Sequence, residues 1–289
     1  MFKIAILGCE NSHAGAFLDF IAQGLFPEVE AIGVYSDVAE PAQKLHEKFG
    51  VPIMKSYDEL VGKVDGIMVT ARHGDNHLKY AKPYLASGIP MFIDKPITVS
   101  EEDAVTLVNE AKKHGVRLCG GSTCAYVEET VELKKYFAEL EVGSVIGGNV
   151  ICPVMLENEY GGFFFYSQHL VQVMVEIFGE DPIAISAKRN GGNIYATVEY
   201  PAFSVSVTFA EDVKYYYAEV FTKSAFVSRK LHIKTESFRH EMKLMDDLLH
   251  GKEMEKDYLS FIKPVFILNA IWRSVNEDGA RVEIQYPSI

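Results

Sequence analysis

The sequence predicts an α/β protein with an N-terminal, doubly wound parallel sheet and a C-terminal mixed α+β domain that contains a largely antiparallel open sheet. Up to about residue 120, short apolar runs alternate with amphipathic helical stretches; beyond it, several apolar runs follow one another without helices. The length of 289 residues and the 48% hydrophobic content suggest two cores. We therefore expect domains at 1–120 and 121–289.

In the first domain, a unit of apolar strand, turn and helix repeats along the chain. Strands are expected at 2–7, 29–35, 66–70, 91–93 and 116–119, and helices at 14–24, 39–49, 77–87 and 100–114. Ser100, followed by Asp103, resembles a capping box at the start of the last of these helices. Such alternation implies a parallel sheet covered on both faces and built by right-handed crossovers.

The second domain begins with helical and strand patterns in turn and continues mainly with strands. Helices are expected at 127–137, 168–178, 238–249 and 259–276, and strands at 145–152, 183–187, 194–200, 203–209, 215–221, 225–233 and 281–285. Most of the strands between 183 and 233 have no helix between them, which favours antiparallel pairing.

One strand of this sheet also predicts a partner. Val205, Val207 and Phe209 alternate with small hydroxyl residues, so one side of the strand is apolar. We expect a second copy of the chain to cover that side in a homodimer or homotetramer, although helices of the same chain can also cover it.

Charge and composition exclude some classes of partner. The net charge is −12 and the chain has no basic cluster, so we expect no binding to nucleic acid or to anionic membranes. Apolar runs such as 265–271 are too short to span a bilayer, and the chain enters a strand at Phe2 without a signal segment. We expect a cytoplasmic protein that binds a small-molecule substrate.

Neither the cysteines nor the histidines show the spacing of a metal site. The four cysteines are Cys9, Cys119, Cys124 and Cys152. They show neither a Cys-x-x-Cys pair nor a zinc spacing, so we expect them to be reduced and mostly buried, with Cys9 exposed beside the ligand. His73 and His77 are four residues apart, but a Gly-Asp-Asn turn begins between them. We therefore expect no metal.

The most informative stretch is Asp94-Lys95-Pro96, which follows an apolar run. Because ligands of open α/β sheets bind at the carboxyl ends of the strands, Lys95 is expected to point into the ligand crevice, at the end of the fifth strand. A lysine there can hold an alcohol or carbonyl oxygen while charge develops on it. The alternative is a surface Lys-Pro turn.

These residues resemble a known family, the oxidoreductases grouped around glucose-fructose oxidoreductase, inositol dehydrogenase and MocA. The segments 3–14, 76–96, 162–169 and 264–284 carry the likeness. The resemblance implies a Rossmann domain followed by a mixed domain whose open sheet commonly mediates oligomerisation. It also implies hydride transfer between a nicotinamide cofactor and a small sugar, polyol or related hydroxy compound. The alternative is a catalytically degenerate member that acts as a ligand-binding sensor or assembly partner.

The resemblance further implies three catalytic residues, Lys95, His169 and Tyr166. Lys95 matches the motif lysine, and His169 matches a histidine that acts as acid and base. Many members carry aspartates three residues before and after this histidine, where this chain has Tyr166 and Gln172. Tyr166 can hydrogen-bond the substrate but cannot hold an imidazolium as a carboxylate would. Tyr126 lies in a segment that often lines the family's substrate cleft, so we expect substrate contacts from Lys95, Tyr126, Tyr166 and His169; a core or surface aromatic is the alternative for Tyr126.

The cofactor loop departs from the dinucleotide fingerprint. Residues 8–13 keep only Gly8 of its three glycines, with Glu10 and His13 in the other two places. We expect the Glu10 carboxylate to face the diphosphate site and to pair with Arg72, because the loops after 2–7 and 66–70 open side by side in the usual strand order 3-2-1-4-5-6. The alternative is that Glu10 turns outward while Asn11 or Ser12 caps the helix.

The end of the second strand predicts which dinucleotide binds. It reads Tyr35-Ser36-Asp37, with an acid close to the position that bonds the adenosine ribose and no arginine directly after it. NAD is therefore favoured over NADP. The residues expected to bind the cofactor are Gly8, Glu10, Asn11, Ser12, His13, Ser36, Asp37, Arg72, His77, Asp94 and Lys95.

Overall fold

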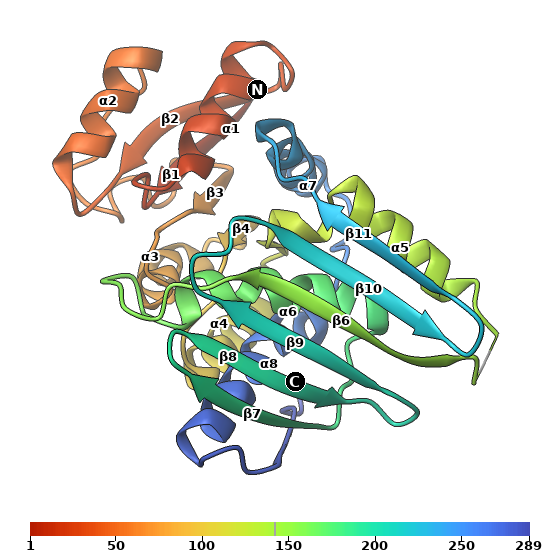
Figure 1. The fold of residues 1–289 in the computed structure, drawn as a ribbon. Helices are drawn as coiled ribbons and strands as arrows, with labels where there is room; N and C mark the ends of the chain where they lie inside the picture. Colours follow the sequence, from red (N-terminus) through yellow and green to blue (C-terminus); the bar gives the residue numbers. More distant parts are fainter. Residues whose placement is uncertain (142) are drawn as a thin grey trace. The chain divides into compact units, whose positions relative to one another are not determined.

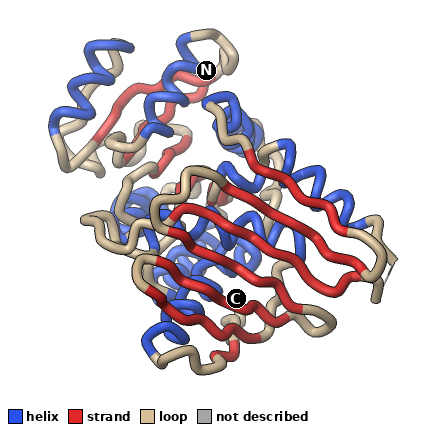
Figure 2. Tube along the Cα trace, in the orientation of Figure 1, coloured by secondary structure: helices blue, strands red, loops and turns tan. Residues whose placement is uncertain are grey.

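The computed structural model describes residues 1–141 and 143–289, which form two compact units (Figures 1 and 2). The first unit contains residues 1–121, 234–262 and 289; the second contains 122–233 and 263–288. The segment 234–262, which the sequence analysis assigned to the second domain, therefore packs with the first. Its helix has a strongly amphipathic pattern, but such a pattern does not specify which sheet the helix covers.

The first unit is built on a parallel five-stranded sheet of order β2-β1-β3-β4-β5. Its strands are β1 (Phe2–Leu7), β2 (Val29–Tyr35), β3 (Gly66–Val69), β4 (Met91–Asp94) and β5 (Leu118–Gly121). Its helices are α1 (Ser12–Ala22), α2 (Ala39–Phe49), α3 (Asp75–Leu85), α4 (Glu101–His114) and α7 (Phe238–Leu249), with the 3-10 helix η2 (Thr235–Ser237) before α7. The predicted Rossmann-type architecture is confirmed.

The expected strand order 3-2-1-4-5-6 is only partly realised, because the strand that should follow α2 is missing. Ile53 forms an isolated bridge with Val34, and the neighbouring Pro52 has no N–H with which to extend the pairing. Lys95 therefore follows the fourth strand of the chain and not the fifth. The neighbouring placement of β1 and β3 is as expected.

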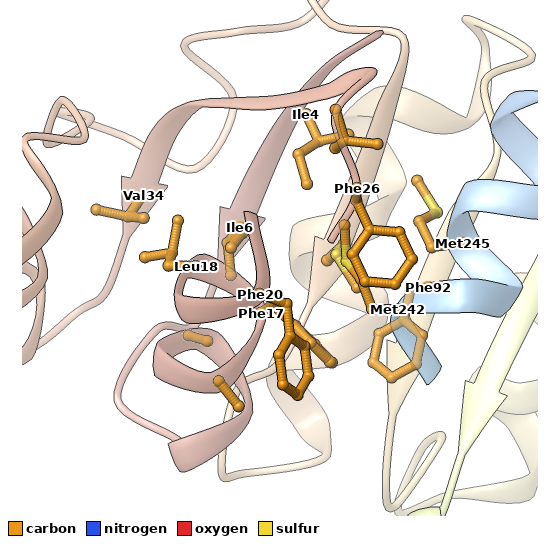
Figure 3. Close-up of a cluster of buried hydrophobic side chains, with 14 of the residues drawn as sticks. Ile4, Ile6, Phe17, Leu18, Phe20, Phe26, Val34, Phe92, Met242 and Met245 are labelled. Atoms are coloured by element: carbon orange, nitrogen blue, oxygen red, sulfur yellow. The ribbon is translucent and has the colours of Figure 1, made fainter. Parts of the chain in front are cut away.

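A buried cluster joins α1 and α7 to the same side of this sheet (Figure 3). Ile4 of β1, Phe17 of α1, Phe92 of β4 and the α7 residues Met242 and Met245 are all part of it. The cluster places α7 beside the start of α1, where the cofactor loop ends. Ser100 caps α4 by accepting a hydrogen bond from the backbone N–H of Asp103, as expected.

The second unit contains a seven-stranded sheet of order β11-β10-β6-β9-β8-β7-β12. Its strands are β6 (Val145–Pro153), β7 (Ala184–Asn190), β8 (Asn193–Glu199), β9 (Ser204–Ala210), β10 (Tyr216–Thr222), β11 (Phe226–Leu231) and β12 (Val282–Glu283). Its helices are η1 (Thr123–Ala125), α5 (Glu128–Ala138), α6 (Phe164–Phe178) and most of α8 (Tyr258–Asn276). Only the β6–β9 pair is parallel among these strands, so the predicted mixed, mostly antiparallel sheet is confirmed.

Helices of the same chain cover one face of this sheet (Figure 1). Val205, Val207 and Phe209 point toward them and are buried, so these side chains do not require a second copy of the chain. The argument for an oligomer from the apolar side of β9 is therefore wrong. The uncovered face carries the hydroxyl residues of β9 together with the exposed aromatic side chains of Tyr195 and Phe226.

None of the helices formed by residues 1–141 and 143–289 combines the length and hydrophobicity that crossing a bilayer requires.

Candidate functional site

The loop after β1 begins at a position that only glycine can occupy. Gly8 has φ +82°, and a Cβ there would lie 2.4 Å from the Cα of Ala71 in the loop after β3. The hydroxyl of Thr70 also donates to the Gly8 carbonyl oxygen, at 3.0 Å. The two loops are therefore in direct backbone contact at the carboxyl edge of the sheet.

Glu10 is held by both of the neighbouring strand ends. One carboxylate oxygen accepts a hydrogen bond from the Ser36 hydroxyl at 3.0 Å, and the other accepts one from the backbone N–H of Arg72 at 3.0 Å. These two donors hold the carboxylate against the ends of β2 and β3. The contact with Arg72 shown here goes to its main-chain N–H.

Asn11 and Ser12 do not cap α1 as the alternative interpretation expected. Asn11 is the N-cap residue but makes no side-chain cap hydrogen bond; its amide instead donates to Asp94 at 2.9 Å. The hydroxyl of Ser12 donates to the Asn11 side chain at 3.3 Å. Asn11 therefore ties the cofactor loop to the end of β4.

His13 lies between two buried carboxyl groups. Its Nδ1 is 3.3 Å from Asp94 Oδ2, and its Nε2 is 3.6 Å from Glu241 Oε2 on α7. Neither ring nitrogen of His13 and neither oxygen of Glu241 completes a hydrogen bond within the described residues. Burial lowers the pKa of His13. Burial, reinforced by the charge of Asp94, raises the pKa of Glu241 well above its ordinary value. We therefore interpret the pair as a neutral imidazole facing a protonated carboxyl group.

Asp94 and Lys95 lie at the carboxyl end of β4, and both are buried. One oxygen of Asp94 accepts the backbone N–H of Lys95 at 2.7 Å, while the other faces Asn11 and His13. The Lys95–Pro96 peptide bond is cis. Asp94 thus fixes the backbone from which the lysine side chain starts.

His77 is enclosed by the loops after β3 and β4. Its Nε2 lies 2.8 Å from the carbonyl oxygen of Ala71, and its Nδ1 lies 3.3 Å from that of Ile97. The side chain is completely buried, and burial lowers its pKa. His77 therefore holds two loops of the crevice together, a different role from the direct cofactor contact that we expected. No group of three or more metal-ligand side chains occurs in the described part of the chain.

Asp37 already has three donors. Its carboxylate accepts hydrogen bonds from the hydroxyls of Tyr35 and Tyr80, at 2.6 and 2.7 Å. The Lys79 ammonium is 3.4 Å away. Burial would raise the pKa of Asp37, but these three donors outweigh it and lower the pKa. The acid after β2 thus connects that strand to α3.

The four cysteines are free and buried, including Cys9, which was expected to be exposed. Burial, together with the nearby charge of Glu10, raises the pKa of Cys9 to about 12, so the thiol stays protonated. The side chain packs into the core cluster behind the loop and does not face a ligand.

In the second unit, Tyr166 and His169 lie one helical turn apart on α6. The helix begins at Phe164, four residues before the predicted start, so His169 lies in its second turn and not at the helix start. The ring centroids of Tyr166 and His169 are 5.7 Å apart, and that of Tyr216 is 5.8 Å from His169. Tyr126 follows η1 and is half-buried.

Ser122, which the sequence analysis missed, is a hydrogen-bond partner of His169. Its hydroxyl lies 2.6 Å from Nδ1 of His169 and also accepts the backbone N–H of Cys124. A hydroxyl oxygen can accept two hydrogen bonds, so it can accept both the Cys124 N–H and an Nδ1–H, which would make Nε2 the basic nitrogen of the ring. The signal was the position of Ser122 just after Gly121, at the carboxyl end of β5.

A cavity of about 450 Å³ adjoins Tyr166 in the second unit. Tyr216, Glu211, Asp212 and Lys214 also line it. The mixture of phenol, carboxylate and ammonium groups suits a ligand that has several hydroxyl groups.

The fold and the loop geometry together define a dinucleotide-binding Rossmann unit joined to a mixed α+β unit. Residues 2–122 match the model of an oxidoreductase family with an NAD-binding Rossmann fold, the glucose-fructose oxidoreductase, inositol dehydrogenase and MocA family. The predicted resemblance to this family is therefore confirmed for the first unit.

Known proteins support the same fold. Glucose-6-phosphate 3-dehydrogenase of Bacillus subtilis (strain 168) is 26% identical over 149 residues, 50% of this chain and 41% of that protein. The chain thus spans about two fifths of the length of this curated relative. The structure of GenD2 from gentamicin A biosynthesis in complex with NAD has a TM-score of 0.86 at 17% identity and covers 98% of this chain and 96% of that one. The myo-inositol 2-dehydrogenase of Lactobacillus plantarum has a TM-score of 0.83 at 15% identity, with 98% and 99% covered.

The first unit fits the dinucleotide that this family binds. The first turn of α1 has no acidic residue, and its N-cap side chain is turned away to Asp94, so its N–H groups can receive a diphosphate. Gly8 allows the close approach of backbone that the fingerprint requires. The residues present are therefore compatible with NAD despite the two lost glycines.

Proposed function

We propose that the protein is an NAD-dependent oxidoreductase that acts on a CH–OH group of a small sugar, polyol or related hydroxy compound. The observation that carries the proposal is Lys95, buried at the carboxyl end of β4 in a family-matched Rossmann unit. The relatives named above as dehydrogenases of glucose 6-phosphate and myo-inositol support this substrate class.

Each unit contributes its own part of the chemistry. NAD held by the loop after β1 would supply the acceptor for the hydride that leaves the carbinol carbon. The Lys95 ammonium binds the substrate oxygen and stabilises its developing negative charge. Nε2 of His169 takes the hydroxyl proton, while its Nδ1–H remains bonded to Ser122. Tyr166 and Tyr126 bind other hydroxyl groups of the substrate.

The test is a turnover assay that supplies NAD or NADP with a panel of sugars, sugar phosphates and cyclitols, and measures formation of the reduced nicotinamide. We expect oxidation of at least one compound with NAD, and turnover at least about 10²-fold slower by the Lys95→Met variant. Binding of NADH by folded protein without turnover of any compound would instead favour a degenerate, ligand-binding family member.

We further propose a cytoplasmic homodimer or homotetramer. The four free cysteines support a reducing compartment. The exposed Tyr195 and Phe226 on the uncovered face of the second sheet support association there. Light scattering at micromolar concentration tests this, and a monomer would contradict the oligomer.

A further inference from the structure

We infer that Glu10, and not Asp37, is the carboxylate that binds the ribose diol of the adenosine half of NAD, and that Glu10 determines the preference for NAD over NADP. The inference rests on the proposed function, since it requires that the crevice binds a nicotinamide dinucleotide. It moves the ribose-binding acid from the end of β2 to the loop after β1.

The Glu10 carboxylate is both correctly placed and still able to accept. Ser36, at the end of β2, and the backbone N–H of Arg72, after β3, each donate to one of its oxygens. Each carboxylate oxygen has two acceptor sites, so each can take one more hydrogen bond. Two vicinal hydroxyls can meet those two oxygens together, and the half-buried side chain remains accessible to them.

Asp37 is committed to the protein itself. The hydroxyls of Tyr35 and Tyr80 bind its two oxygens, and Lys79 pairs with it. Burial and the hydrogen bonds to Asp37 raise the pKa of both phenols, that of Tyr35 to about 12, so both remain donors at neutral pH. Binding a ribose diol to both oxygens of Asp37 would require displacement of a donor from Oδ2, which already accepts from Tyr80 and Lys79.

The same arrangement disfavours a 2′-phosphate. That group would bring two negative charges close to the carboxylate of Glu10, with the charge of Asp37 on the adjoining loop. The Lys79 ammonium nearby already pairs with Asp37. A ribose hydroxyl, by contrast, donates a charge-assisted hydrogen bond to Glu10.

The experiment compares Glu10→Gln with the matched control Asp37→Asn, using NADH and NADPH fluorescence titrations. Glu10→Gln should weaken NADH binding by about tenfold to a hundredfold, and should narrow the ratio of the NADPH and NADH dissociation constants. Asp37→Asn should change NADH affinity by less than about threefold. In calorimetry, the parent and Asp37→Asn should prefer ADP to 2′-deoxy-ADP, and Glu10→Gln should not.

Two outcomes would overturn the inference while leaving the proposed function intact. These are a loss of NADH binding in Asp37→Asn but not in Glu10→Gln, and a parent that binds NADPH as tightly as NADH. If Glu10→Gln fails to fold, Ser36→Ala removes one hydrogen-bond donor of the Glu10 carboxylate and should weaken NADH binding several-fold. An unchanged affinity for NADH would contradict the inference. A folded parent that binds neither nucleotide would refute both the inference and the proposed function.

Discussion

The cofactor loop of the first unit and helix α6 of the second both depart from the family pattern, but in opposite electrostatic directions. The loop gains one charged side chain where glycines are usual: Glu10 binds Ser36 and the Arg72 backbone, while the second replacement, His13, is a neutral imidazole between two carboxyl groups. Helix α6 loses charge, because Tyr166 and Gln172 replace aspartates and the neutral Ser122 hydroxyl faces His169.

The comparison shows two ways in which one chain can compensate for a lost motif. In the loop, the usual glycines let the backbone pack closely. Here the Glu10 side chain instead forms hydrogen bonds with the ends of the two neighbouring strands. On α6, a hydroxyl orients the imidazole but stabilises its charged form less than a carboxylate would. We therefore expect charge-changing substitutions in the cofactor loop to reduce cofactor affinity. In α6, we expect the weaker stabilisation of the imidazolium to affect the pH dependence of turnover.

The largest effect is expected at Lys95, the residue that keeps the family pattern. Lys95→Met removes the cation that stabilises the developing alkoxide, so kcat should fall by about 10²–10³-fold. NADH affinity and far-UV circular dichroism should stay close to those of the parent. Lys112→Met, on the exposed surface of α4, is the control and should retain full turnover. Turnover of Lys95→Met within a few-fold of the parent would contradict the assignment.

His169→Gln should come next. Loss of the acid and base should reduce kcat/KM by about 10²-fold or more and remove the rising limb of its pH profile. Tyr166→Phe should have an intermediate effect, because the ring remains and only one hydroxyl is lost. If His169→Gln keeps a pH profile like that of the parent, another group moves the proton.

Ser122→Ala should have a smaller effect of a distinctive kind. The variant removes the acceptor for Nδ1–H, so the imidazolium loses stabilisation and the apparent pKa of the rising limb should fall. We expect kcat to drop by about tenfold, with recovery in Ser122→Thr, which retains the hydroxyl. A loss of rate without any shift of the pH profile would indicate only a packing role for Ser122.

The part of this site that depends on local pattern could be predicted from the sequence. Alternating apolar runs specify the parallel sheet, and the end of such a run places Lys95 at the ligand edge. The partners of His169 could not be predicted, because Ser122 is 47 residues away and a hydrogen bond between distant segments has no periodic signature.

Glu241 illustrates the same limit for the first unit. It lies on the apolar face of α7, beside Met242 and Met245. A single acidic residue on such a face indicates that its carboxyl group is buried against a polar partner. The sequence does not specify that this helix returns to the first unit, because its apolar face suits either sheet. The role of His13 therefore became clear only from the structure.

The smallest effect that we predict concerns stability, and it tests the charge state of the cofactor loop. The folded protein holds the proton of Glu241 above its ordinary pKa of 4.5, whereas the unfolded chain releases it. Between that value and the raised pKa the folded state binds more protons, so its stability falls as pH rises. Glu241→Gln cannot ionise and escapes this loss. Its melting temperature relative to the parent should therefore rise as the pH increases above about 5.

His13 acts in the opposite sense, and this separates the two groups. Its pKa is lowered below 6.5, so it reduces stability as pH falls below that value and contributes no further change above it. The difference in melting temperature between Glu241→Gln and the parent should therefore continue to grow above pH 6.5, where His13 is neutral in both the folded and the unfolded state. Glu253→Gln, an exposed change in the same segment, should show no such trend. A melting-temperature difference that is flat with pH would mean that Glu241 is ionised in the folded protein, paired with a charged His13.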